Sequence, residues 1–228
     1  GFTMINYDRV VKYWNKVFGE TNKGPIKTAS IGQNDLDKAL DWLCQNSNSI
    51  LDFGCGNGVM LFKCCLRGTK NHRGIDISKE GIKVAKEIPE ISEKEGFTFT
   101  VGGVEELEAI SDGSFDGVIL SNIIDNLIPQ DAIKVLTEVK RILKIGGKLL
   151  VKLNPFLTEK EIKEWNIKVI EKNFLDDGLF LWNQSTEEWT GLLESYFSIV
   201  DYKEIYYPEY DQYNRLFLVI NKMNEENI

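Results

Sequence analysis

The sequence predicts an α/β protein with a doubly wound, mostly parallel sheet that helices cover on both faces. Two observations lead to this fold class. Short apolar runs alternate with amphipathic helical segments from residue 48 to about residue 170, which is typical of consecutive β-α-β units. The tail then changes to two strand-like runs joined by the tyrosine-rich loop 206–213. We expect these two runs to form an antiparallel hairpin that closes the sheet.

Seven short runs have the length and composition of strands, and each is bounded by residues that favour turns. The terminal hairpin makes the last strand antiparallel. The runs are 49–53, 74–77, 97–101, 115–120, 148–153, 197–205 and 215–221.

The helices between these strands are predicted from apolar spacing and from capping residues. Ser78 precedes a segment whose apolar residues fall on one side of a helix, so we expect it to be the N-cap. Residues 132–143 are amphipathic, and the pair Gly146-Gly147 is expected to end that helix and lead into the next strand. Two further helices are expected at the capping-box pairs Thr158–Glu161 and Ser185–Glu188.

The N-terminal segment 1–47 is predicted to be a helical cap. It contains two helical patterns, about 5–19 and 34–47, separated by a polar, glycine-containing stretch. We expect this cap to lie as a lid over the ligand side of the sheet core, 48–221. No internal repeat or low-complexity linker divides the chain, so the prediction is a single domain, 1–228.

The composition narrows the classes of partner. A net charge of −8 and a pI near 4.9 argue against non-specific binding to nucleic acid or anionic lipid, which needs a basic surface. No apolar run is long enough to span a bilayer. We therefore expect a cytoplasmic protein without a membrane partner, and the charge disfavours a nucleic-acid partner. The four cysteines lack the paired spacing of a metal site, so no metal is expected.

The stretch 50–58 is the most informative part of the chain. A buried strand runs into the turn Gly54-Cys55-Gly56-Asn57-Gly58, whose alternate glycines let a ligand lie against bare backbone. An apolar helix starts at Val59, so its N-terminus points back at that ligand. Cys55 stands where a small side chain is required, and we interpret it as steric rather than nucleophilic. This turn is predicted to bind a cofactor.

The residues around the turn indicate which cofactor. The dinucleotide motif G-x-G-x-x-G would place a third glycine at position 59, where this chain has Val59. Asp52 would repel a pyrophosphate and favours a ligand with an ammonium group. S-adenosylmethionine carries an ammonium and a sulfonium and has no phosphate. Asp76 ends the next strand, where a carboxylate can accept the hydroxyls of a ribose.

On these motifs the sequence resembles the class I S-adenosylmethionine-dependent methyltransferases over about residues 35–221. The stretches that carry the resemblance are 50–58, 74–78, 115–122 and 141–148. It implies a Rossmann-like seven-stranded fold, methyltransferase activity, S-adenosylmethionine as cofactor and S-adenosylhomocysteine as product. It also implies contacts with the methionine part (Asp52, Gly54, Cys55, Gly56, Asn57, Gly58), the ribose (Asp76), the adenine (Ile77) and the underside of the methionyl chain (Ser121, Asn122).

Two stretches depart from the family's pattern. After the third strand the family commonly has Gly-Asp-Ala, whereas this chain has Gly102-Gly103-Val104-Glu105. Gly103 replaces the acid, so the adenine is expected to use the Val104 amide together with Glu105. After the fourth strand, 123–126 replaces the paired histidines of many relatives, and the Asn-Pro-Pro-Tyr signature is absent there.

The acceptor side is less determined. The single histidine, His72, is predicted to lie on the surface before the second strand, which leaves no histidine base. Asp125 or Asn126 is expected to orient the acceptor, and Tyr207 in the loop 206–213 to form a pocket wall. Tyr7, Tyr13 and Trp14 on the first helix are candidates to close the lid.

The leading interpretation is methyl transfer to a small molecule. The alternatives are a non-catalytic donor-binding module that serves as a partner or regulatory subunit, and an NAD-dependent oxidoreductase. Among methyltransferases, protein and RNA acceptors stay open. The sequence does not determine the acceptor's nucleophilic atom, any general base or the oligomeric state.

Overall fold

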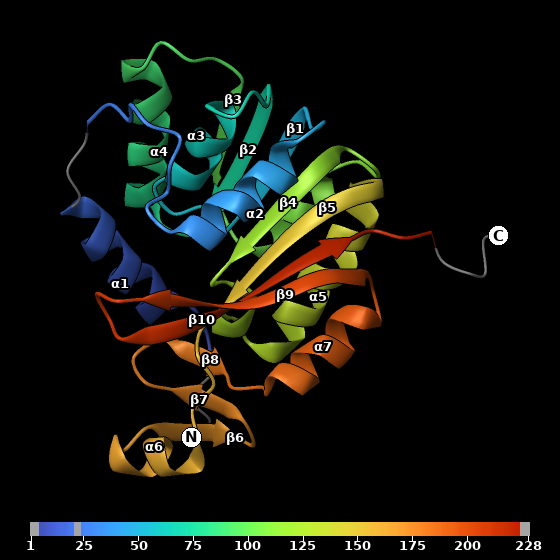
Figure 1. Ribbon diagram of the computed structural model, residues 1–228. Helices are drawn as coiled ribbons and strands as arrows, with labels where there is room; N and C mark the ends of the chain where they lie inside the picture. The colour runs from blue at the N-terminus through green and yellow to red at the C-terminus, as the bar shows by residue number, and fades with distance from the viewer. Residues whose placement is uncertain (1–4, 21–23, 224–228) are drawn as a thin grey trace.

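A seven-stranded sheet forms the centre of the computed structural model, which describes residues 5–20 and 24–223 (Figure 1). The strand order is β3-β2-β1-β4-β5-β10-β9. The neighbours from β3 to β5 pair in parallel, and β10 is antiparallel to both β5 and β9. This confirms the predicted seven-stranded sheet. The strands are β1 Ser49–Phe53, β2 Asn71–Asp76, β3 Phe97–Val101, β4 Phe115–Ser121, β5 Leu143–Leu153, β9 Ser198–Tyr207 and β10 Gln212–Ile220.

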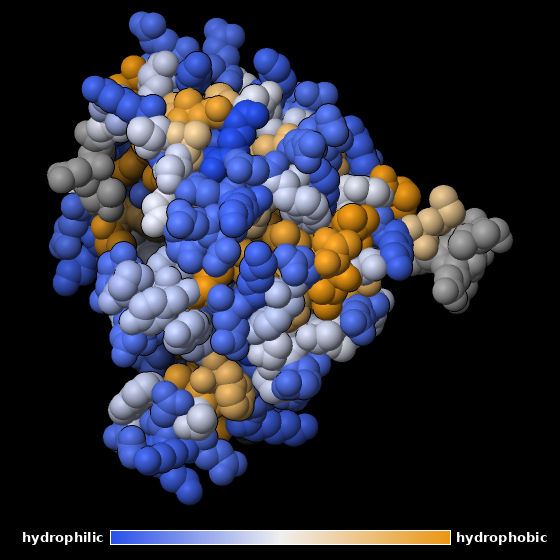
Figure 2. Space-filling model, in the orientation of Figure 1, coloured by the Kyte–Doolittle hydropathy of each residue, from blue (hydrophilic) through white to orange (hydrophobic). Residues whose placement is uncertain are grey.

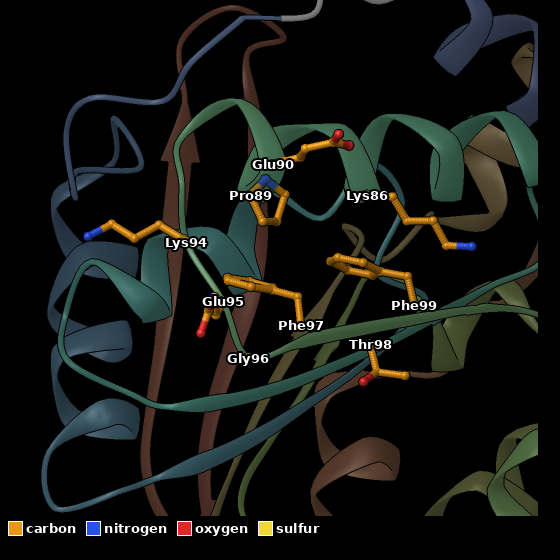
Figure 3. Close-up of a pocket in the computed structure, with 9 residues that line it drawn as sticks. All are labelled: Lys86, Pro89, Glu90, Lys94, Glu95, Gly96, Phe97, Thr98 and Phe99. Carbon is orange, nitrogen blue, oxygen red and sulfur yellow. The ribbon is translucent and has the colours of Figure 1, made fainter.

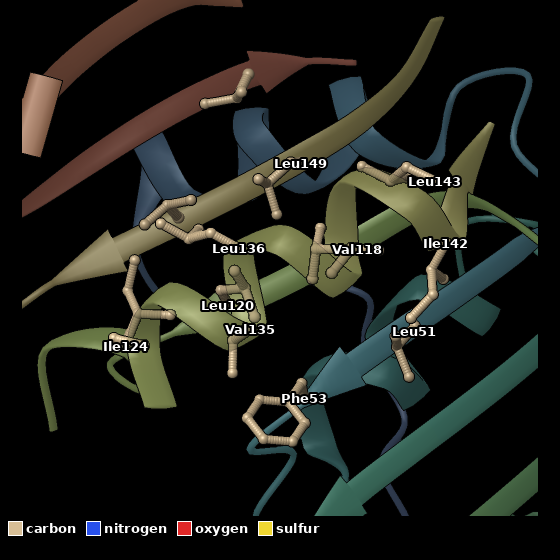
Figure 4. Close-up of a cluster of buried hydrophobic side chains, with 14 of the residues drawn as sticks. Leu51, Phe53, Val118, Leu120, Ile124, Val135, Leu136, Ile142, Leu143 and Leu149 are labelled. Carbon is tan, nitrogen blue, oxygen red and sulfur yellow. The ribbon is translucent and has the colours of Figure 1, made fainter. Parts of the chain in front are cut away.

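Helices cover both faces of this sheet. Residues of α2, α3 and α4 share one apolar cluster with one face, and residues of α5 and α7 share a second cluster with the other. In the second cluster the side chains of β1 and β4 meet those of α5 (Figure 4). The helices are α1 Asp8–Gly19, α2 Asn34–Cys44, α3 Val59–Cys65, α4 Lys79–Ile91, α5 Pro129–Ile142, α6 Glu159–Glu164 and α7 Thr186–Glu194, with the 3-10 turns η1 Val104–Ala109 and η2 Ile124–Asn126.

The predicted helix starts are confirmed where a side chain caps the backbone. Ser78 accepts a hydrogen bond from the Gly81 amide, and both expected capping boxes are present at the starts of α6 and α7. Boundaries without such a cap moved by a few residues. The first helix begins at Asp8, after the predicted residue 5, and the second ends at Cys44.

A second, small sheet was not predicted. It consists of β6 Lys168–Glu171, β7 Phe174–Asp176 and β8 Phe180–Trp182, which pair antiparallel. Strands of three or four residues are too short to show a clear alternation of apolar and polar positions. Phe174 and Phe180 pack against Val10 of α1. The small sheet therefore adjoins the N-terminal helix.

The prediction that His72 lies on the surface was wrong. The strand β2 begins at Asn71, three residues before the predicted start, so His72 lies inside the sheet and is 3% exposed. Its ring stacks on Phe97 at 4.3 Å between centroids, and its nitrogens contact Thr69 Oγ1 at 2.6 Å and the Gly96 carbonyl oxygen at 2.9 Å. Burial lowers its pKa. His72 lies near the amino end of β2, so it is still remote from the ligand edge.

The glycine pair Gly146-Gly147 does not end a helix. The helix α5 ends at Ile142, and β5 begins at once and runs through both glycines. Gly146 has φ of +81°, and the pairing of β4 with β5 shifts register nearby. The pair therefore shapes an irregular start of β5.

The surface is mostly hydrophilic on the face seen in Figure 2. Apolar residues gather there where β5 begins and the ends of β9 and β10 lie beside it; the exposed residues Ile145 and Val200 belong to β5 and β9. Across the described ranges no helix is long and apolar enough to cross a membrane. The same residues contain no group of three side chains suited to hold a metal ion.

Candidate functional site

The glycine turn connects β1 to α3 at the carboxyl edge of the sheet. The Gly54 and Cys55 amides donate to the Ile75 carbonyl oxygen at 2.8 and 3.0 Å, which ties the turn to β2. Gly56 has φ of +55°, a conformation that side chains disfavour. A Cβ atom at Gly56 would lie 2.9 Å from the Phe18 ring of α1. The turn is thus bare backbone that α1 partly covers.

Asp52 is a buried carboxyl group directly below this turn. It is 2% exposed, and its Oδ1 accepts no hydrogen bond from any described residue. Burial, with a further contribution from the Asp76 charge, raises the pKa of Asp52 to about 8. A buried carboxylate without a partner is costly, and a cationic ligand group would compensate it. Asp52 is therefore poised to meet a positive charge.

Asp76 holds the opposite side of the turn. Its Oδ2 accepts from the Gly56 amide at 2.8 Å, and its Oδ1 accepts from the Ser78 amide at 2.9 Å. Burial raises the pKa of this carboxyl group, while the two amide hydrogen bonds oppose that shift. The carboxylate is therefore fixed in position at the tip of β2.

A cavity of about 190 Å³, the inner cavity, opens beside Asp76 and Gly54, the first residue of the turn. Six of the predicted contact residues line it (Gly54, Asp76, Ile77, Gly103, Val104, Glu105). The other seven predicted residues do not line the inner cavity. Ser121 and Asn122 lie at the exit of β4, and the rest belong to the end of β1 and the adjoining turn (Asp52, Cys55, Gly56, Asn57, Gly58). Burial raises the pKa of the Cys55 thiol, which agrees with a steric role.

Several residues of the inner cavity were not predicted as contacts. They are Tyr7, Phe53, Ile75, Gly102, Ile123, Leu127, Asp131 and Lys134. The Tyr7 hydroxyl donates to Asp131 Oδ2 at 2.5 Å and accepts from the Ile128 amide at 3.0 Å. The only signal for Asp131 was its place in the first turn of the helix that follows β4. Tyr7 thus anchors α1 beside the inner cavity.

The stretch after β3 leads into η1. The Glu105 side chain folds back, and its Oε1 accepts from the Gly103 amide at 2.9 Å. Val104 starts the 3-10 turn η1 and is buried. Both residues line the inner cavity, and their contact with the adenine stays a prediction.

The exit of β4 is fixed to its neighbouring strands. Asn122 has φ of +53°; its amide donates to the Lys152 carbonyl oxygen at 2.7 Å, and its side chain donates to Asn214 Oδ1 at 2.9 Å. The Ser121 hydroxyl is within 3.5 Å of Asn122 Oδ1. These contacts join the end of β4 to β5 and β10.

The three candidates for acceptor orientation differ in position. Asp125 is fully buried and accepts hydrogen bonds from the backbone and side-chain nitrogens of Asn154 at 2.8 and 3.1 Å. It lines neither the inner cavity nor the second cavity described below. Tyr207 contacts Lys152 Nζ through its hydroxyl at 3.3 Å and also lines neither. Of the three, Asn126 alone lines the second cavity.

This second, outer cavity has a volume of about 710 Å³. It lies among the exits of β4 and β5, the small sheet with α6, the tip of the β9–β10 hairpin and α1 (Figure 1). The described residues that line it are Trp14, Asn126, Asn154, Pro155, Leu157, Glu161, Trp165, Ile167, Asp177, Leu179, Leu181, Tyr210, Asp211, Gln212 and Tyr213.

A third hollow is a groove of about 460 Å³ between the end of α4 and β3 (Figure 3). Pro89 and the rings of Phe97 and Phe99 line it. It lies at the amino end of β3, whereas ligands of open α/β sheets bind at the carboxyl ends. We therefore do not assign it to the functional site.

The chain is similar to known proteins. Residues 45–196 match the methyltransferase-domain family. The chain belongs to this family. The matched region of the methyltransferase carries the glycine turn, both acids and the exits of β4 and β5.

Individual relatives of the methyltransferase are distant. It is 25% identical over 201 residues to the tRNA N(3)-methylcytidine methyltransferase trm140 of Schizosaccharomyces pombe (83% of this chain, 64% of that protein). It is 27% identical over 150 residues to EEF1A lysine methyltransferase 2 of Homo sapiens (59% and 61%). The chain thus spans less than two thirds of the length of these relatives. The N-methyltransferase NodS of Bradyrhizobium japonicum, solved with S-adenosylhomocysteine, shares the fold with a TM-score of 0.69 at 12% identity (95% and 100% covered).

The cofactor of this methyltransferase is S-adenosylmethionine, and the residues of the site suit it. The unpartnered Oδ1 of Asp52 offers an acceptor for an ammonium group. Side chains at Gly54, Gly56 and Gly58 would collide with Ile123, Phe18 and Ala85, so the turn keeps a bare backbone surface. No phosphate-binding cation lies among the residues of the turn.

Proposed function

We propose that this methyltransferase transfers a methyl group from S-adenosylmethionine to a small molecule bound in the outer cavity. The observation that carries this proposal is the position of two cavities on either side of one segment. Ile123 and Leu127 line the inner cavity and Asn126 lines the outer one. The outer cavity has a volume within the range of roughly 300–1,000 Å³ typical of small-molecule sites.

The inner cavity and the glycine turn would hold the donor. In this proposal Asp52 accepts from the ammonium group, the backbone of 54–58 supports the methionine part and Asp76 accepts from the ribose hydroxyls. Ile77 and Val104 contact the adenine, together with Gly103 and Glu105. Ser121 and Asn122 support the methionyl chain through the end of β4.

The chemistry is a direct displacement. When bound, S-adenosylmethionine supplies a methyl group whose carbon forms a new bond to the acceptor's lone pair as the carbon–sulfur bond breaks and its electrons stay on sulfur. The protein's own residues align the acceptor, an effect worth up to about 7–11 kcal/mol when reacting atoms are held near attack geometry. His72 lies near the amino end of β2, so no histidine is available as a base.

Small-molecule specificity is supported by charge as well as by shape. Some relatives are named for tRNA or protein substrates, so these two acceptor classes are the alternatives to a small molecule. The net charge of −8 disfavours a polyanionic tRNA acceptor. The outer cavity also lies beneath α1 through Trp14, which suits an acceptor that the protein can largely enclose.

The experiment has two parts, run on the full chain. Calorimetry with S-adenosylhomocysteine and with NAD tests the donor; binding of NAD alone would point to an oxidoreductase. A metabolite pool is then incubated with S-adenosylmethionine carrying a deuterated methyl group, and mass spectrometry follows the label. Label on a metabolite supports the proposal. Donor binding without labelled product would favour a non-catalytic binding module.

A further inference from the structure

We propose that the outer cavity recognises a positively charged amine or ammonium group on the acceptor. This inference rests on the proposed function, since it takes the outer cavity as the acceptor site. Three features of the cavity point to it: aromatic faces, carboxylates, and an amide oxygen that accepts no hydrogen bond from the described residues.

The aromatic side chains are unusually exposed for their size. Trp165, Tyr210 and Tyr213 are 59%, 73% and 54% exposed, and all three line the outer cavity together with Trp14. Exposed aromatic residues that gather at one hollow mark a binding site more often than scattered ones do. The faces of such rings attract cations, most strongly for tryptophan.

Two of these rings are held in place by neighbouring side chains. Trp14 stacks on Phe18 with centroids 5.5 Å apart and planes 20° apart. Tyr213 packs against Tyr206 at 4.9 Å, and the Tyr206 hydroxyl donates to Asp211 at 2.8 Å. The rings therefore keep their orientation without a ligand, which reduces the entropy lost on binding.

The charges of the outer cavity have one sign. Glu161, Asp177 and Asp211 line it, and none of its lining residues within the described part of the chain is Lys or Arg. Arg9 is engaged elsewhere, in an ion pair with Asp176 at 2.7 Å. An anionic acceptor would meet only like charges here, whereas a cation would be attracted.

The polar side chains of the β4 and β5 exits add hydrogen-bond acceptors. Asn154 donates through its side-chain nitrogen to Asp125 and Asn126, each at 3.1 Å, and Asn126 donates to the Phe180 carbonyl oxygen at 2.7 Å. Asn154 Oδ1 accepts no hydrogen bond from any described residue. Both N–H groups of the Asn154 amide are thus used within the protein, which leaves its oxygen as an acceptor for a ligand.

The test compares two probes of equal shape and different charge. Choline serves as a compact ammonium, and 3,3-dimethylbutan-1-ol is its neutral isostere. Both are titrated into the full chain saturated with S-adenosylhomocysteine, and ligand-observed NMR follows their methyl resonances. Choline is expected to bind about tenfold more tightly, since several aromatic and acidic groups contribute.

Variants locate the effect. Trp165→Leu and Asp177→Asn are each expected to weaken choline binding about fivefold and to leave the neutral probe unchanged. Asp201→Asn is the matched control, because this exposed acid lies at the other end of β9. Equal binding of both probes, no binding of either, or choline binding that both cavity variants retain would overturn the inference. Calorimetry on the same samples separates the two proposals. If the wild type does not bind S-adenosylhomocysteine, the proposed function itself is refuted.

Discussion

Asp52→Asn tests the assignment of the donor's ammonium partner. The substitution keeps the shape of a side chain that is almost fully buried and removes its charge. In the wild type the carboxyl group has a pKa of about 8, so it is about 1% ionised at pH 6 and half ionised at pH 8. The ionised form is the one that binds an ammonium group.

These fractions set the size of the effect. Apparent affinity scales with the population of the competent form, so wild-type binding of S-adenosylhomocysteine should strengthen about 50-fold between pH 6 and pH 8. Asp52→Asn loses a charged hydrogen bond worth about 2 kcal/mol, which weakens binding at pH 8 about 30-fold. It should also lose the pH dependence in this range.

The same substitution acts on the stability of the free protein in the opposite direction. The folded pKa of Asp52 lies above its unfolded value, so the folded state holds the proton more tightly and this group's contribution to stability is lost as the pH rises from about 4 to about 8. The variant has no such group. The free energy of unfolding of the variant, relative to that of the wild type, should therefore increase between about pH 4 and pH 8. Above about pH 8 the difference between the two should stay constant.

Calorimetry at several pH values measures the affinity, and urea unfolding measures the stability. Asp125→Asn is the matched control, because Asp125 is another fully buried carboxyl with a raised pKa that lines neither cavity. It should keep the wild-type pH dependence of binding. If Asp52→Asn binds S-adenosylhomocysteine as the wild type does at every pH, Asp52 is not the ammonium partner.

Three further outcomes are expected. Gly56→Ala and Gly113→Ala share a left-handed backbone, with φ of +55° and +56°. Gly113→Ala, whose added Cβ meets nothing within 4 Å, should cost about 1 kcal/mol of stability in urea unfolding, and Gly56→Ala should cost more, because its Cβ would lie 2.9 Å from the Phe18 ring. Only Gly56→Ala should also weaken S-adenosylhomocysteine binding in calorimetry, by at least about tenfold, because its Cβ disturbs the backbone surface proposed to hold the methionine part. Tyr7→Phe removes two hydrogen bonds and should cost about 1.5 kcal/mol in urea unfolding, whereas Tyr13→Phe at an exposed position should change stability by less than about 0.5 kcal/mol. Arg215→Met removes buried hydrogen bonds to two carbonyl groups and should cost about 3 kcal/mol, seen as a fall in Tm of roughly 6–12 °C by calorimetry.

The arrangement of Asp52, the glycine turn and Asp76 was predictable because its signals are local in sequence. The acid, the glycine turn and the following helix occupy consecutive positions from Asp52 to Val59, and strand geometry then places Asp76 beside them. Their spacing alone brings them together. Tyr7, Asp131 and Lys134 come from two other segments that the fold brings to the same cavity. No local sequence pattern indicates that these residues lie close together. Asp131 and Lys134 were therefore not predicted, and Tyr7 was predicted only as part of a lid.

The acceptor side was harder because the small sheet was not predicted. Residues 168–182 contribute Asp177, Leu179 and Leu181 to the outer cavity. Asp125 at the exit of β4 was expected to orient the acceptor, whereas it is buried and accepts a hydrogen bond from the Asn154 amide. The hairpin loop contributes Tyr210 and Tyr213 to the cavity, as expected of a pocket wall, but Tyr207 lies back along β9 beside Lys152.

The helix α1 connects the donor and acceptor sides. It places Tyr7 in the inner cavity, Phe18 on the glycine turn and Trp14 in the outer cavity. The Ser78 hydroxyl at the start of α4 also donates to Asn15 Oδ1 of α1 at 2.7 Å. The inner cavity of about 190 Å³ is smaller than the roughly 300 Å³ at which ligand sites begin. In the proposed complex the donor extends from the inner cavity along the glycine turn, where the Phe18 ring lies over Gly56. Because Phe18 stacks on Trp14, a shift of Phe18 on donor binding would reach the outer cavity. We expect acceptor affinity to depend on whether the donor site is filled.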